Sequence, residues 1–255
     1  MSRFVLKFGT GVLSRLDGRA LDAAPFRRIA DEVATLVKAG HSCILVSSAA
    51  IAAGVRVLGL DRRPEDLPGK QACAAAGQPE LMHIWAAAFR RHGLSVAQLL
   101  LTHDDIDSRM RRRNANNTIE RLLAQGGIVP IINENDSVSL EELRFGDNDR
   151  LSAEVACLVQ ADRLIILTSS DGLTDQKKVR IPIIRDMEKA FSLVRPEKGE
   201  MSVGGMKTKL EAVQLALAAH IPTIIIDGKK RGHIAEAAAF RDIGTRFPVP
   251  KPKRP

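Results

Sequence analysis

The 255-residue sequence predicts an α/β fold, a three-layer αβα sandwich around a central, mostly parallel sheet. Two observations carry this prediction. Short, continuous apolar segments alternate with helix-length segments, and each apolar segment leads into a loop of small or polar residues. Continuous apolar runs are typical of strands buried on both faces, as parallel strands are. Because ligands bind beyond the carboxyl ends of such strands, the loops that follow them are the places to search for function.

The expected elements follow in chain order. Strands are expected at residues 3–7, 43–46, 96–101, 128–132, 164–167 and 223–226. Helices are expected at residues 26–37, 49–55, 70–91, 111–123, 152–158 and 206–219. Gly40 is expected to end the first helix, and Gly77 with Pro79 predicts a break in the third. The least regular stretch, 174–203, predicts loops and a hairpin.

Composition restricts the class of protein. A net charge of +8, from 38 basic and 30 acidic residues, favours an anionic partner such as a nucleotide or an acidic substrate. Aromatic residues make up 4% and Tyr is absent, which argues against a nucleic-acid-binding protein that stacks bases. No apolar run reaches the roughly 18–20 residues of a membrane span. Three widely spaced cysteines indicate free thiols and a cytoplasmic location, and the basic tail at 250–255 is expected to be disordered.

Two glycine-containing loops are candidates for phosphate binding. Lys7 ends the first strand and is followed by Gly9, while the segment GGMKTK at 204–209 opens the last long helix. Glycine lets the backbone approach an oxyanion closely, and lysine offers a point charge to a phosphoryl group. Neither loop has the G-x-x-x-x-G-K-[ST] pattern of a P-loop. An ordinary glycine turn with solvated lysines is the competing interpretation.

Small residues dominate the loop VSSAAIAAG at 46–54. They leave room for a ligand at the N-terminus of the next helix, where backbone amides favour an anion such as a carboxylate. Capping of that helix by Ser47 or Ser48 is the alternative. Thr168 and Ser169 follow another strand, at a place where a nucleotide base or ribose could lie.

The sharpest polar signal is the pair of segments IINEND at 131–136 and FGDND at 145–149. So many polar residues would be costly to bury without partners. The intervening residues 137–144 are expected to form a short excursion that returns to the same site. Asn and Asp side chains there can hold an ammonium group. Turn formation, which the same residues favour, is the alternative.

In this order, the segments resemble the amino acid kinase family. The matching segments are KFGTGVL at 7–13, VSSAAIAAG at 46–54, KQACAAAGQ at 70–78, LLLTHDD at 99–105, VPIINENDSV at 129–138, FGDNDRLSA at 145–153 and GGMKTKLEA at 204–212. The INEND and GDND pair is the most specific, and is similar to that of members that phosphorylate free glutamate. The other segments are shared across the family.

The resemblance implies the amino acid kinase fold as one domain over 1–249, with an amino-acid-binding half at about 1–158 and a nucleotide-binding half at about 159–249. It implies ATP and Mg²⁺, L-glutamate as the acceptor and L-glutamyl 5-phosphate as the product, which is the first step of proline biosynthesis. It also implies glutamyl phosphate reductase downstream, proline as a feedback inhibitor, and a homo-oligomer, either dimer or tetramer. Membrane and nucleic acid are not implied partners.

Residue roles also follow from the resemblance. Lys7 and Lys209 would stabilise charge on the transferring phosphoryl group, and Asp149 would organise the two lysines. The residues implied for glutamate are Ser48, Ala49, Asn133, Asp136, Asp147 and Asn148. Those implied for the nucleotide are Lys7, Gly9, Thr168, Ser169, Val203, Gly204, Gly205, Met206, Lys207, Thr208 and Lys209. No protein metal ligand is implied, because the ATP phosphates would hold most of the Mg²⁺ coordination.

The sequence departs from the family pattern at several points. Ala49 stands where glycine is usual, Ser169 where aspartate is usual, and Ser202-Val203 where Gly-Thr is usual. The resemblance is to a short form, for which the C-terminal PUA domain that many relatives carry is not expected. Three alternatives stay open: a related kinase acting on another carboxylate or phosphate, a ligand sensor of the same fold without turnover, and a basic RNA-binding module.

Overall fold

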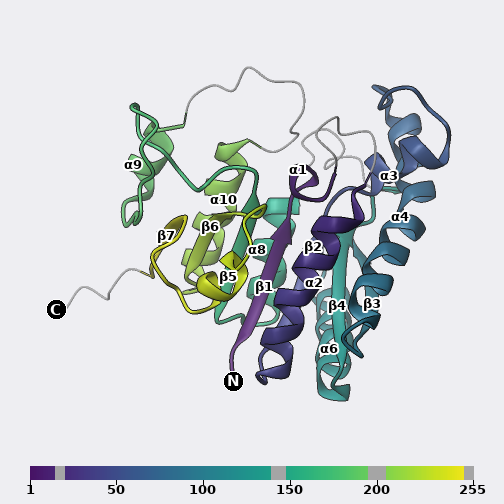
Figure 1. Cartoon of the computed structure of the whole chain (residues 1–255), viewed down its shortest axis with the longest axis horizontal. Helices are drawn as coiled ribbons and strands as arrows, with labels where there is room; N and C mark the ends of the chain where they lie inside the picture. The colour runs from purple at the N-terminus through teal and green to yellow at the C-terminus, as the bar shows by residue number, and fades with distance from the viewer. Residues whose placement is uncertain (15–20, 139–147, 195–204, 250–255) are drawn as a thin grey trace.

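A seven-stranded sheet lies at the centre of the computed structural model, which describes residues 1–14, 21–138, 148–194 and 205–249 (Figure 1). Its strand order is β3-β4-β2-β1-β5-β6-β7. The strands are β1 (Arg3–Phe8), β2 (Ser42–Ser47), β3 (Ser95–Leu101), β4 (Ile128–Glu134), β5 (Arg163–Thr168), β6 (Thr223–Asp227) and β7 (Thr245–Phe247). Every neighbouring pair is parallel except β6 with β7. The predicted α/β class with a mostly parallel sheet is confirmed.

Helices cover both faces of the sheet. They are α1 (Thr10–Leu13), α2 (Ala23–Lys38), α3 (Ala50–Val57), α4 (Leu67–Arg90), α5 (His103–Asp107), α6 (Arg109–Gln125), α8 (Asn148–Leu158), α9 (Met187–Ser192), α10 (Met206–Ala218) and α11 (His233–Ala238). Helices α2, α4 and α11 pack into one apolar cluster, and α6, α8 and α10 into the other. The result is a three-layer sandwich, with α2 crossing the near face of the sheet in Figure 1.

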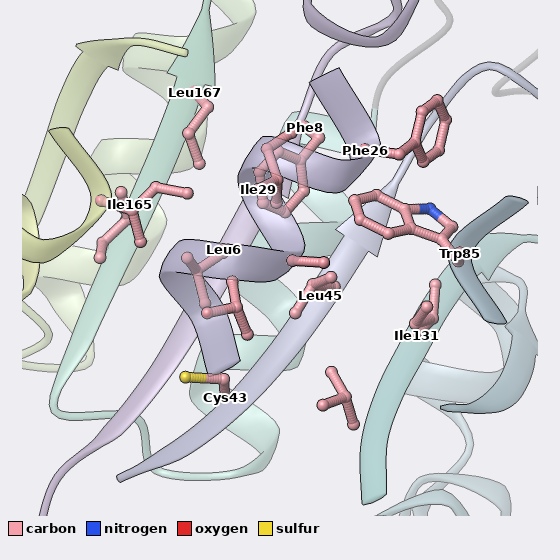
Figure 2. Packing of buried hydrophobic residues seen from close by; sticks show 14 of the residues in the cluster. Leu6, Phe8, Phe26, Ile29, Cys43, Leu45, Trp85, Ile131, Ile165 and Leu167 are labelled. Atoms are coloured by element: carbon pink, nitrogen blue, oxygen red, sulfur yellow. The ribbon is translucent and has the colours of Figure 1, made fainter. Parts of the chain in front are cut away.

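Strand β1 shows why these strands lack polar alternation. Phe4, Leu6 and Phe8 point into the first apolar cluster, whereas Val5 points into the second, and all four are buried. A strand covered on both faces needs apolar side chains at successive positions. Figure 2 shows Leu6 and Phe8 packed with neighbouring strands and with helix α2.

Trp85 of α4 connects this core to the end of the sheet. Its ring lies 4.5 Å from the Phe26 ring, edge to face, and is fully buried (Figure 2). The indole Nε1 donates a hydrogen bond of 3.0 Å to the hydroxyl of Ser47, the last residue of β2. A buried tryptophan usually needs such a partner for its N–H. The bond therefore holds the beginning of the loop that follows β2.

The predicted break in the long helix is wrong. Helix α4 runs from Leu67 to Arg90 with Pro79 inside it. Gly77 serves packing instead, because a methyl group there would lie 1.9 Å from the Ala50 carbonyl oxygen, and one at Gly54 would lie 1.8 Å from the Cys73 carbonyl oxygen. The two glycines let the backbones of α3 and α4 come into contact, and α4 continues through Gly77 as an unbroken helix packed on α3.

The sequence analysis did not predict several short helices and one short strand. Helices α1, α5, α9 and α11 and strand β7 were not expected, and each is too short for a periodic pattern. In the irregular stretch, Thr174 and Arg180 form one antiparallel bridge, and α9 follows. Cys43, Cys73 and Cys157 are free thiols. Within the described ranges, no helix combines the length and apolarity needed to cross a membrane.

Candidate active site

The candidate site lies where the carboxyl ends of the central strands meet. Strand β1 has β2 on one side and β5 on the other. The chain leaves β1 toward β2 and later leaves β5 toward β6, in opposite directions across the sheet. Such a change of direction opens a crevice at the carboxyl ends of the two strands in parallel α/β sheets. Lys7 of β1 and Thr168 of β5 stand at this point.

A buried group of three charges forms the first part of the site. The Lys7 Nζ lies 2.5 Å from one carboxylate oxygen of Asp149, and the Lys209 Nζ lies 3.1 Å from the other. Asp149 has no exposed surface, and the two lysine side chains are less than a tenth exposed. We call Lys7, Asp149 and Lys209 the charged cluster. It joins β1, α8 and α10, which are far apart in the sequence.

The three side chains of the charged cluster sum to one positive charge. Burial by itself raises the pKa of Asp149, but Lys7 and Lys209 outweigh it and hold that pKa below its ordinary value. Asp149 also lies in the first turn of α8, where the helix dipole favours a negative charge. Thr208 adds a hydrogen bond of 3.1 Å to the carboxylate. Two ammonium groups thus share one ionised carboxylate, an arrangement suited to an incoming anion.

Uncharged side chains form the second part of the site. The Asn148 Nδ2 donates to the Ser48 hydroxyl and to the Asn133 Oδ1, both at 2.9 Å. The Asn133 Nδ2 donates in turn to the Gln78 Oε1 at 2.9 Å. We call Ser48, Gln78, Asn133 and Asn148 the amide cluster. Asn148 directly precedes Asp149, so the first turn of α8 supplies both clusters.

Comparison with known proteins places the chain in a family. The sequence pattern of the Amino acid kinase family matches residues 2–227. The chain belongs to the amino acid kinase family. The resemblance that the sequence motifs indicated is therefore confirmed.

Relatives with assigned names cover almost the whole chain. A glutamate 5-kinase of Thermus thermophilus is 46% identical over 250 residues, which are 96% of this chain and 67% of that protein. The glutamate 5-kinase of Anaeromyxobacter dehalogenans is 44% identical over 256 residues, 97% of this chain and 67% of that protein. The chain thus spans about two thirds of the length of these relatives.

A solved structure with the same fold is the N-acetylglutamate synthase from Neisseria gonorrhoeae, complexed with coenzyme A and L-arginine. It superposes with a TM-score of 0.68 at 15% identity, and the match covers 98% of this chain and 62% of that chain. At this identity the likeness extends to the fold alone.

The residues that the family resemblance implied for glutamate are partly brought together. Ser48, Asn133 and Asn148 join in the amide cluster. Asp136 lies just beyond β4 and half-buried, and its carboxylate opposes the lowering of the Arg63 pKa that desolvation causes. Asp147 lies outside the described residues.

The residues implied for the nucleotide lie on facing loops. The Gly9 backbone N–H donates to the Leu167 carbonyl at 3.4 Å, which ties the loop after β1 to the end of β5. Ser169 follows β5, and its side chain lies 4.0 Å from the position a methyl group would take on Gly11. Gly205 caps α10, where Met206 begins the helix. Val203 and Gly204, like Ser202, lie outside the described residues.

Lys207 differs from the other lysine on its helix. Its side chain is 72% exposed, and its Nζ lies 3.9 Å from a carboxylate oxygen of Glu211 one turn later. Lys209 instead turns into the charged cluster, with 9% of its side chain exposed. A nucleotide contact by Lys207 stays a prediction, because the side chain lies on the solvent side of the first turn of α10.

Ala49 occupies a backbone conformation that glycine adopts more easily, and glycine is the residue that the resemblance led us to expect there. Its φ is 90° and its ψ is 10°, in the left-handed region, immediately before α3. This conformation costs an alanine roughly 1–2 kcal/mol. Its methyl group is buried in the same apolar cluster as Leu45 and Trp85. The extra methyl therefore strains the backbone, while its carbon packs in the core.

The sequence interpretation assigned no role to Gln78, Gln98 or Arg63. Gln78 lies at the end of the matching segment 70–78, a polar residue that follows small and apolar ones. It is 8% exposed. A buried glutamine beside alanines is a signal in itself, because burial demands hydrogen-bond partners. Its partner Asn133 is 55 residues away, a pairing that only the fold makes visible.

Proposed function

We propose that the chain transfers the γ-phosphate of ATP to the γ-carboxylate of L-glutamate, giving L-glutamyl 5-phosphate, the first step of proline biosynthesis. The observation that supports this most is the placement of the charged cluster next to the amide cluster on one helix terminus. The charged cluster can offset phosphate charge, and the amide cluster can orient a small polar acceptor. Relatives named glutamate 5-kinase, at 41–46% identity over nearly the whole chain, support the same acceptor.

The chemistry requires little from a general base. A carboxylate is already a nucleophile at neutral pH, so its oxygen can attack the γ-phosphorus as the bond to the bridging oxygen breaks and ADP leaves. Catalysis is then mainly positioning and charge stabilisation. In this proposal Lys7 and Lys209 stabilise the transferring group, and Asp149 holds both ammonium groups in place.

Glutamate recognition falls to the amide cluster and Asp136. The Ser48 hydroxyl accepts from Asn148, so its own hydrogen can be donated to a substrate carboxylate. The Asn148 Oδ1 and the Asp136 carboxylate can accept from the substrate ammonium group. Glutamate carries both a carboxylate and an ammonium group, so different side chains would bind these two groups of one molecule.

The nucleotide would lie mainly in the half at about 159–249, along the loop after β5 and the start of α10, and would also meet the loop after β1. Asp149 is already engaged by two lysines, and the described residues contain no set of three metal-binding side chains placed to hold an ion. As the family resemblance implies, Mg²⁺ would be carried mainly by the ATP phosphates, where it would neutralise part of their charge.

The wider setting is proposed from the family resemblance. A labile acyl phosphate needs a consuming enzyme, which we propose to be glutamyl phosphate reductase. Proline as feedback inhibitor, a homo-oligomer and a cytoplasmic location belong to the same proposal. The free thiols fit a reducing compartment.

The testing experiment traps the product. ATP, Mg²⁺ and hydroxylamine are incubated with the protein and with L-glutamate, aspartate, N-acetylglutamate or no acceptor, and the coloured hydroxamate is measured. We expect a signal with glutamate alone. A signal with a different acid and none with glutamate would make that acid the substrate in place of glutamate. A folded protein that binds ATP and gives no signal with any acceptor would favour a sensor over an enzyme.

A further inference from the structure

A row of hydrogen-bonded side chains runs from the edge of the sheet to the start of α8. The Gln78 Nε2 donates to the Gln98 Oε1 at 3.0 Å, and the Gln78 Oε1 accepts from the Asn133 Nδ2 at 2.9 Å. The Asn133 Oδ1 then accepts from the Asn148 Nδ2 at 2.9 Å. Gln98 is exposed on the edge strand β3, whereas Gln78, Asn133 and Asn148 are all less than a tenth exposed. The row therefore links an exposed side chain to the buried amide cluster.

One backbone group sets the direction of the whole row. The Glu134 N–H donates to the Asn133 Oδ1 at 3.0 Å, and a backbone N–H can only donate. The oxygen of Asn133 must therefore face Glu134, and its NH₂ group must face Gln78. Gln78 is then required to present its oxygen to Asn133 and its NH₂ group to Gln98. The orientation of each amide, which is otherwise ambiguous, follows from its neighbour.

The same logic fixes what Asn148 presents. Because the Asn133 Oδ1 is an acceptor, Asn148 must turn its NH₂ group toward it and toward Ser48. The Asn148 Oδ1 is left buried and, among the described residues, without a hydrogen-bond partner. A buried acceptor without a partner is unfavourable until a donor arrives. A substrate ammonium group is such a donor.

We propose that Gln78 is a positioning residue for the amino acid substrate, an inference that rests on the proposed function. Gln78 holds the Asn133 amide in place, and Asn133 fixes the face of Asn148 that meets the substrate. Gln78 acts through two other amides. Without its oxygen, the Asn133 NH₂ group loses its buried acceptor. The Glu134 N–H still sets which way Asn133 faces, but it then holds that side chain from one side only, so both asparagines are placed less firmly.

The first test is Gln78→Met, which keeps the length of the side chain and removes both hydrogen bonds. We expect the KM for glutamate to rise about tenfold, because one hydrogen bond that orients the acceptor is worth about one factor of ten, while the KM for ATP stays within about twofold. Gln71→Met, on the same helix and outside the row, is the matched control. Equal changes in both KM values, or an unchanged glutamate KM, would overturn the proposal.

The second test is Gln78→Glu, read against pH. A carboxylate would face the Gln98 Oε1, another acceptor, and this repulsion would draw the side chain away from its place beside Asn133, whereas a protonated carboxyl can donate to Gln98 and accept from Asn133. A buried carboxyl titrates above its ordinary range. We therefore expect the ratio of the variant's glutamate KM to that of the unmodified protein to fall toward one between about pH 8 and pH 6. Taking the ratio removes the titration of Glu134, Asp136 and Asp149, which both proteins share.

The two tests separate this proposal from the proposed function. If the unmodified protein makes no hydroxamate from glutamate, the proposed function has failed. If it does so and both Gln78 variants keep its glutamate KM at every pH, only the positioning role has failed. Should Gln78→Met not fold, the Gln78→Glu series decides alone, because a merely structural role predicts a lower melting temperature and no pH-dependent recovery of the glutamate KM.

Discussion

The charged cluster and the amide cluster begin at adjacent residues, Asp149 and Asn148, yet they work by different physics. The charged cluster depends on the sum of its charges, two positive against one negative, all buried. The amide cluster has no net charge and depends on the direction of each hydrogen bond. A phosphoryl group and an amino acid can therefore be bound side by side, because one cluster is selective for charge and the other for hydrogen-bond direction. Substitutions should therefore damage kcat in one cluster and KM in the other.

The largest effect is expected for Lys209→Ala. Removing a positive charge aimed at the transferring phosphoryl group should lower kcat by about 10³-fold, while the KM for glutamate changes by less than about threefold. Steady-state kinetics with each substrate varied would measure both. Lys38→Ala, at the exposed end of α2, is the control for loss of a lysine. If kcat were unchanged, Lys209 would have no part in the chemistry.

The next largest effect is expected for Asp149→Asn, on the free energy of unfolding. This change leaves two buried lysines without their shared carboxylate, and breaking a buried ion pair costs about 3–5 kcal/mol. Denaturant unfolding at neutral pH would measure the loss.

The pH dependence supplies a second check on Asp149. Its pKa is lower in the folded chain than in the unfolded chain, so its contribution to stability is present above the ordinary pKa and is lost as pH falls through the folded value. The gap in unfolding free energy between the unmodified protein and Asp149→Asn should therefore shrink below about pH 4. A constant gap from about pH 7 to pH 3 would mean that Asp149 is not the ionised partner of the lysines.

In the part of the site that binds the acceptor, Asp136→Ala should raise the KM for glutamate by about 10- to 100-fold, as expected for a lost hydrogen bond to a charged group. The KM for ATP should hardly change. Asp104→Ala, an exposed acid on α5, serves as the control. An equal rise in both KM values would show that Asp136 supports the whole site and does not select the amino acid.

The sequence predicted β1, β2, β4, β5 and β6 well because nearly all of their residues are buried and most are apolar. It also predicted the more exposed edge strand β3, but it missed the three-residue edge strand β7. It predicted a break in α4 wrongly, since Gly77 and Pro79 are helix breakers only where packing does not compensate. The charged cluster was assigned through family resemblance, because nothing in the spacing of Lys7, Asp149 and Lys209 shows that they meet. The role that we propose for Gln78 was missed for the same reason, since its bond to Asn133 spans 55 residues.

The smallest effect is expected at Ala49, which has a left-handed backbone conformation that favours glycine. Ala49→Gly removes the strain of a φ of 90°, worth roughly 1–2 kcal/mol. It also removes a buried methyl group, worth about 0.8 kcal/mol, and adds chain entropy to the unfolded state. These terms nearly cancel, so the unfolding free energy should change by less than about 1 kcal/mol. The kcat and the glutamate KM should stay the same or improve. A large loss of activity in a stable variant would show that the loop between β2 and α3 has been rebuilt around alanine, and that its methyl group helps to place Ser48.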